Sequence, residues 1–267
     1  MGRLIKNILG LLERLLFFRP SPRGLFVINY HGTPETVLEN VAKHLEYYSK
    51  NYLLIGPETF EDICRKGSYP QGPKPLLLLT FDDGMENNRH VLSLLEKKDI
   101  RAFFFVIPAF IDAADPENYL ATVIRPGYSN SKETAPEDFR PMDWDTLRTL
   151  LAKGHRIGSH TYSHSLAKED DEEKSRKEIV YSRQLLEEKL SAGVPYFCSI
   201  NNTAVSIGPL QEQLIRAHYS FHFTTFYGNN YPSVDPLRIE RINVEAYWNM
   251  NEVRYALGNI RKTLIKT

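Results

Sequence analysis

Two adjacent carboxylates, Asp82 and Asp83, directly follow the apolar run 76–80. Barrel and open-sheet enzymes build their sites at the carboxyl ends of such buried strands. Consecutive side chains point in different directions where a chain leaves a strand, so one carboxylate could bind a metal ion while its neighbour faces a water molecule. The alternative is that one of the two caps the helix that follows, a role that Asp fills well.

A second candidate site contains the histidines His160 and His164, which follow the predicted strand 156–159. If this segment turns helically, residues four apart lie on one face, and two imidazoles can then chelate one divalent ion. The pattern H-x-x-x-H is common by itself, so two ordinary surface histidines are the alternative. Two neutral imidazoles and one carboxylate leave coordination positions open for water, as in hydrolytic metal enzymes.

Short apolar runs alternate with amphipathic stretches throughout residues 25–267, which is typical of a parallel sheet or barrel with helices outside. The predicted strands are 25–30, 76–80, 102–107, 156–159, 196–200, 221–226 and 238–244. The predicted helices are 36–50, 86–97, 143–153, 169–190, 209–217 and 251–262. Two of the strands are apolar without alternation, so both of their faces should be covered.

Residues 1–18 predict an amphipathic helix, because leucines and isoleucines recur there at helical spacing. The stretch falls short of the roughly 20 apolar residues that span a bilayer. No small-residue cleavage site follows, so we expect no secretory signal and a cytoplasmic protein. The helix either packs on the domain as an extra layer or associates peripherally with a membrane, with its basic residues near anionic headgroups.

The rest of the composition sets limits on function. Lys and Arg together number 33, as do Asp and Glu, and this balance argues against a nucleic-acid-binding protein. The two cysteines, Cys64 and Cys198, lack the spacing of a zinc knuckle or redox motif. No composition shift divides residues 25–267, so we predict one domain there, preceded by the helix and a Pro-rich linker at residues 1–24.

The motifs T-F-D-D-G at 80–84 and H-T-Y-S-H at 160–164 resemble the first two motifs of the polysaccharide deacetylase family, the NodB-homology carbohydrate esterases. Residues 29–31 resemble its early Tyr-His strand, residues 142–145 with 153–160 resemble the unit before its second motif, and residues 223–225 with 241–244 resemble its closing strands. The resemblance covers nearly the whole chain from residue 25. It implies an α/β fold, a distorted (β/α)7 barrel.

When the family motifs are matched to this sequence position by position, the resemblance implies that Asp83, His160 and His164 bind a divalent metal. It also implies that Asp82 is the general base. The implied reaction is hydrolysis of an acetyl group from an N-acetylated sugar, in a polysaccharide, an oligosaccharide or a lipid-linked form, with metal-bound water as nucleophile. Zinc suits this ligand set, with cobalt or nickel as alternatives. His31 ends a predicted strand and is a candidate for contacting the substrate.

The chain departs from the family pattern at two places. Residues 197–202 replace the third motif and contain no proline, arginine or glycine, so Asp82 is expected to lack a cationic neighbour and to have a raised pKa. Asn201 and Asn202 are the candidates for a modified substrate-positioning role. The late histidine of the family is also absent. Two alternatives follow: a catalytically inactive carbohydrate- or metal-binding protein of the same fold, or a hydrolase of a non-sugar amide.

Overall fold

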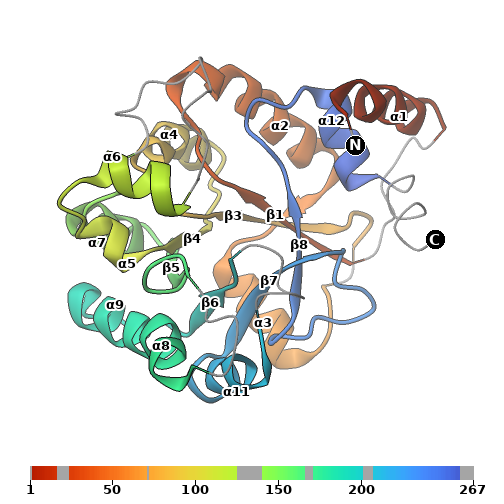
Figure 1. Ribbon diagram of the computed structural model, residues 1–267. Coiled ribbons are helices and arrows are strands. Elements are labelled where there is room, and N and C mark those ends of the chain that lie inside the picture. The colour runs from red at the N-terminus through yellow and green to blue at the C-terminus, as the bar shows by residue number, and fades with distance from the viewer. Residues whose placement is uncertain are drawn as a thin grey trace.

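Seven parallel strands close into a ring in the computed structural model, which describes residues 2–16, 24–70, 72–124, 140–165, 171–200 and 207–258 (Figure 1). The order around the ring is β1-β8-β7-β6-β5-β4-β3, and β3 pairs along its whole length with β1. A short eighth strand, β2, is added beside the start of β3. The strands are β1 Leu25–Tyr30, β2 Leu53–Leu54, β3 Leu76–Phe81, β4 Phe103–Val106, β5 Arg156–Ser159, β6 Tyr196–Cys198, β7 Phe221–Tyr227 and β8 Ile239–Asn243.

Helices surround the ring, as the alternation of the sequence predicts. The longer ones are α1 Arg3–Leu16, α2 Leu38–Asn51, α3 Pro57–Lys66, α4 Arg89–Lys97, α7 Trp144–Ala152, α9 Ser182–Leu190, α11 Pro209–His218 and α12 Met250–Leu257. Shorter α-helices are α5 Pro108–Ile111, α6 Pro116–Tyr119 and α8 Glu172–Arg176, with 3₁₀ turns η1 Glu35–Val37 and η2 Glu86–Asn88 and π-helical turns η3 Leu120–Ile124 and η6 Lys177–Tyr181. The α/β barrel expected from the sequence is therefore confirmed. None of the described helices is long and apolar enough to cross a membrane.

The alternation of side chains along each strand directs them to two faces, one outside the ring and one inside it. One set packs beneath α2, α4, α7, α9 and α12, outside the ring. The other set faces inward and fills the barrel with apolar side chains, which include Leu25, Val27, Leu76, Leu78, Phe103, Phe105, Tyr196, Cys198, Phe223 and Ile239. Residues two positions apart lie on the same face of a strand, so the inward series continues beyond these apolar residues. Toward the carboxyl ends it becomes polar, with Asn29, Asp82 and Arg241.

Helix α3 and strand β2 have no counterpart among the elements predicted from the sequence. Helix α3 is ten residues long and buries only three of them, Pro57, Phe60 and Ile63, so its apolar face is narrow. Phe60 nevertheless packs into the inward-facing core. Its ring centroid lies 5.6 Å from that of Phe103 and 5.4 Å from that of Phe223. Helix α3 thus contributes to the apolar filling of the barrel.

Replacing Phe60 with Ala should lower the free energy of unfolding by about 3–5 kcal/mol, because a fully buried ring is removed from among aromatic neighbours that cannot collapse around the cavity. Urea denaturation followed by circular dichroism would measure the change. Lys66→Ala in the same helix is the control and should alter stability by no more than about 0.5 kcal/mol, since Lys66 is 65% exposed. Equal stability of the two variants would contradict the assigned role of α3.

Candidate active site

The two carboxylates separate because the chain turns sharply after β3. Asp83 and Gly84 both have left-handed backbone conformations, with φ of 69° and 68°. A side chain at position 84 would also meet Val106, because a Cβ there would lie 3.0 Å from its Cγ1. The following turn η2 has Met85 as its N-cap, without a side-chain hydrogen bond. The alternative that one of the two Asp residues caps this element is therefore wrong.

The two histidines converge on Asp83. Nε2 of His160 lies 3.5 Å from Asp83 Oδ1, and Nε2 of His164 lies 3.7 Å from the same oxygen. The segment between the histidines is a bend rather than the helical turn expected from their spacing, with Thr161 at φ 66° and His164 at φ 57°. Left-handed backbone at three non-glycine residues around one cluster is typical of a functional site, where surrounding contacts hold the strain.

A buried glutamate on η6 supplies those contacts. The carboxylate of Glu178 accepts hydrogen bonds from the Ser163 backbone N–H at 2.8 Å and from the Ser163 hydroxyl at 2.5 Å. The carbonyl of Glu178 accepts another from the Tyr162 N–H at 3.0 Å. Glu178 is only 2% exposed. Glu178, which no motif in the sequence singled out, therefore anchors the loop that carries His164, and the Tyr119 hydroxyl adds a hydrogen bond to the Ser163 carbonyl at 3.0 Å.

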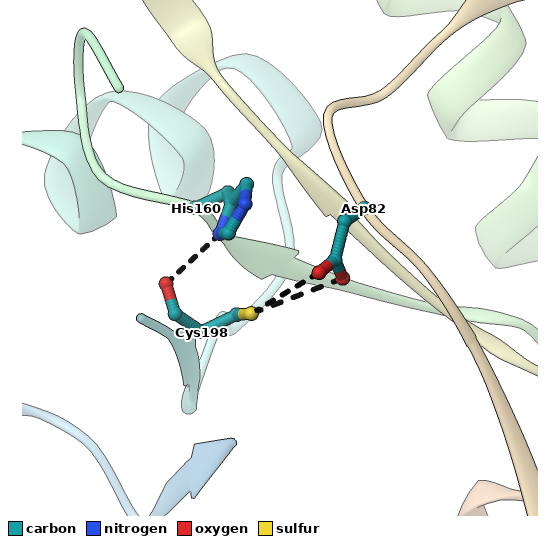
Figure 2. A group of neighbouring side chains, drawn as sticks. All are labelled: Asp82, His160 and Cys198. Carbon is teal, nitrogen blue, oxygen red and sulfur yellow. Dashed lines mark hydrogen bonds between the residues drawn. The ribbon is translucent and has the colours of Figure 1, made fainter. Parts of the chain in front are cut away.

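His160 is oriented by Cys198. The Nδ1 of His160 lies 3.0 Å from the Cys198 carbonyl, which can only accept a hydrogen bond, so Nδ1 carries the proton and Nε2 has its lone pair free (Figure 2). A hydrogen bond of this kind is the usual partner of a metal-binding histidine. Burial lowers the pKa of His164 to about 4, despite the opposing charge of Asp83. Near neutral pH the His164 ring is thus uncharged and able to ligate.

These three side chains fit a divalent metal ion. The ligand atoms of Asp83, His160 and His164 lie within 4.8 Å of one another in a buried cluster. A second group, Asp82 with His160 and Cys198, satisfies the same distance. Burial raises the pKa of the Cys198 thiol well above its ordinary value, so this sulfur keeps its proton and is a poor ligand. Cys198 Sγ instead lies 3.8 Å from Asp82 Oδ1 as a weak donor (Figure 2).

Asp82 has a cationic neighbour, which corrects the expectation drawn from the altered third motif. Nη1 of Arg241, on β8, donates to Asp82 Oδ1 at 2.8 Å, and both side chains are buried. Burial by itself raises the pKa of the Asp82 carboxyl, but Arg241 and the nearby His160 outweigh burial, and the pKa lies below its usual value. The missing arginine is therefore replaced from a different strand. Sequence reasoning missed it because Arg241 was matched only to a closing strand.

A pocket of about 450 Å³ opens over this cluster. Its lining includes Asp82, Asp83, His160, His164 and Arg241, together with His31, Asn29, Asn243, Glu245, Thr225, Tyr247 and Ile124. Asn29 donates to Asp82 Oδ2 at 3.3 Å and to Asn243 Oδ1 at 3.1 Å. The hydrogen bonds of Asp82 therefore continue through Asn29 to Asn243 in the pocket wall. His31 lies in the lining, and its contact with substrate stays a prediction. Asn201 and Asn202 lie outside the described residues.

The chain matches known proteins at the level of a family and of a fold. Residues 70–200 match the family model for polysaccharide deacetylase. No functionally curated protein matches the chain in sequence. Among solved structures, IcaB from Ammonifex degensii is 22% identical with a TM-score of 0.68, covering 90% of this chain and 99% of its own.

Two further structures have the same fold at lower identity. Streptococcus pyogenes deacetylase PplD in complex with acetate is 16% identical with a TM-score of 0.66, over 89% of this chain and 99% of its own. The BpsB deacetylase domain from Bordetella bronchiseptica is 19% identical with a TM-score of 0.63, over 85% and 97%. These likenesses show a shared fold, and the matched family model includes both the carboxylate pair and the histidine pair. By this match, residues 70–200 belong to the polysaccharide deacetylase family.

Proposed function

We propose that this protein is a metal-dependent hydrolase that removes the acetyl group from an N-acetylated sugar. The observation that carries the proposal is the convergence of Asp83, His160 and His164 beside an ion-paired Asp82 at the floor of one pocket. Members of the family are sugar N-deacetylases. A pocket of about 450 Å³ is within the usual size range for a small-molecule site.

Asp83, His160 and His164 would hold the metal, and zinc suits one carboxylate and two imidazoles. When bound, a divalent ion supplies Lewis acidity toward the acetyl carbonyl and lowers the pKa of water. Because Asp83 and not Asp82 would bind the metal, Asp82 remains available to accept a proton. Its pKa below the usual value keeps it ionised at neutral pH, which a general base requires.

The hydrogen bonds to Asp82 would fix its direction as a base. Arg241 donates to Oδ1 and Asn29 donates to Oδ2, which leaves each oxygen with remaining acceptor capacity toward the pocket. A base held in this way can take the proton of an attacking water and then pass it to the leaving amine. The arrangement weakens the case for an inactive protein, because that alternative rested partly on a missing arginine.

Asp82→Asn should retain bound metal and lose activity by a factor of about 10²–10⁴, because the amide has nearly the same shape but cannot accept the proton of water. The measurement is acetate release from N-acetylglucosamine oligomers and from lipid-linked acetylated sugars, with metal-loaded wild type and variant side by side. Release by the wild type alone supports the proposal. No release from any sugar by a metal-loaded wild type would contradict it, and release only from non-sugar amides would reassign the substrate.

His164→Ala should weaken binding of a divalent metal by more than about tenfold, because one of three protein ligands is lost. Competition with a chromophoric chelator would measure the affinity for zinc, and Asp83→Ala should behave in the same way. His218→Ala is the matched control, since His218 ends α11 and lies outside the cluster. Wild-type affinity in both His164→Ala and Asp83→Ala would place the metal elsewhere.

Arg241→Met should shift the acidic limb of the kcat/KM profile to higher pH. The guanidinium lowers the pKa of Asp82, so its removal raises that pKa and the base becomes protonated at a pH where the wild type is still active. The lone buried carboxylate should also cost about 3–5 kcal/mol of stability. Adding Asp82→Asn to this variant should recover part of the loss. If the folded Arg241→Met protein has its acidic limb at the wild-type pH, Arg241 does not control the pKa of the general base.

A further inference from the structure

The face of α1 that points away from the barrel is apolar and exposed. Leu4 is 74% exposed, Ile8 52% and Leu11 45%, with Ile5 and Leu12 beside them. We call these five residues the α1 stripe, since their helical spacing places them on one face. They make up half of the large hydrophobic side chains that are exposed among the described residues. The apolar surface is thus concentrated on one helix rather than scattered.

The opposite face of α1 is docked, which fixes the direction of the stripe. Helix α1 lies against α12 at the edge of the molecule (Figure 1). Gly10 is the close contact, because a side chain there would overlap the Asn251 backbone. Arg3 Nε lies 3.0 Å from Glu252 Oε1, and Lys6 Nζ lies 4.3 Å from the centroid of the Trp248 ring. Turning the stripe inward would break all of these contacts.

The sequence segment that contains the stripe carries a net positive charge. Residues 1–24 contain five basic residues and one acidic residue, although the whole chain balances 33 of each. The acidic residue, Glu13, is only 6% exposed and so faces the protein. Arg3 is still 62% exposed despite its ion pair. Two copies of a segment with this net charge would repel one another, whereas an anionic surface with an apolar interior would attract both the charge and the stripe.

We propose that α1 lies in the plane of an anionic lipid surface with the stripe inserted between the headgroups. Fourteen helical residues are about 21 Å long, which suits an interfacial helix and not a spanning one. The pocket would then lie beside the lipid. The Arg3 guanidinium carbon lies 5.4 Å from the centroid of the Tyr247 ring, and Tyr247 lines the pocket. This docking does not depend on the chemistry of the site.

Vesicle flotation with the full-length protein tests the proposal without any substrate. The probes are vesicles of phosphatidylcholine alone and of phosphatidylcholine with phosphatidylglycerol. We expect at least tenfold tighter binding to the anionic vesicles, and weaker binding as salt is raised because the charge component is screened. The variant Leu4→Gln/Ile8→Gln/Leu11→Gln should reduce binding at least tenfold. Thermal unfolding should be unchanged, since the three side chains are exposed.

The matched control is Leu53→Gln/Val123→Gln, which removes two exposed apolar side chains from other parts of the surface. This control should bind vesicles as the wild type does. The proposal is overturned if the folded wild type binds neither type of vesicle, or if the triple variant binds as well as the wild type. A lipid-free dimer that the triple variant abolishes, together with no vesicle binding, would also overturn it by showing that a second copy covers the stripe.

Discussion

The buried ion pair between Asp82 and Arg241 is the interaction on which the rest of the site depends. Two charges removed from water are costly unless each finds close partners. Arg241 meets this demand by donating to Asp82, to the Thr80 hydroxyl and to the Thr224 carbonyl, so one guanidinium joins β3, β7 and β8. Pairing of β1 with both β3 and β8, which closes the ring, brings these strands around a common interior. The pair therefore couples the position of the proposed base to the closure of the ring.

The same pair separates the roles of two adjacent carboxylates. Asp82 points into the barrel and is surrounded by donors, whereas Asp83 faces the two histidines after a left-handed turn. Environment, and not residue type, makes one of them suited to accept a proton and the other to bind a metal. The donors around Asp82 also include Cys198, to which the sequence assigned no role.

The histidine loop illustrates how strain is held at a site. Two left-handed residues, Thr161 and His164, would be unfavourable in an unsupported loop. Glu178 offsets this cost with hydrogen bonds to the loop backbone and to Ser163, from a π-helical turn in the element that follows. Such turns frequently occur at functional sites, because the extra residue redirects a side chain. Glu178 thus belongs to the structural support of the site without touching the pocket.

Local sequence determined much of this protein. The seven apolar runs, the alternation of strand and helix, and the positions of Asp82, Asp83, His160 and His164 at strand ends are all properties of neighbouring residues, and the barrel confirms them. Short elements with few buried residues, such as α3, escaped prediction because packing against distant rings stabilises them. Tertiary structure alone decided that Arg241 neutralises Asp82, that Glu178 holds the histidine loop and that α1 turns its stripe outward. Each of these depends on contacts between segments far apart in the chain, which no local pattern encodes.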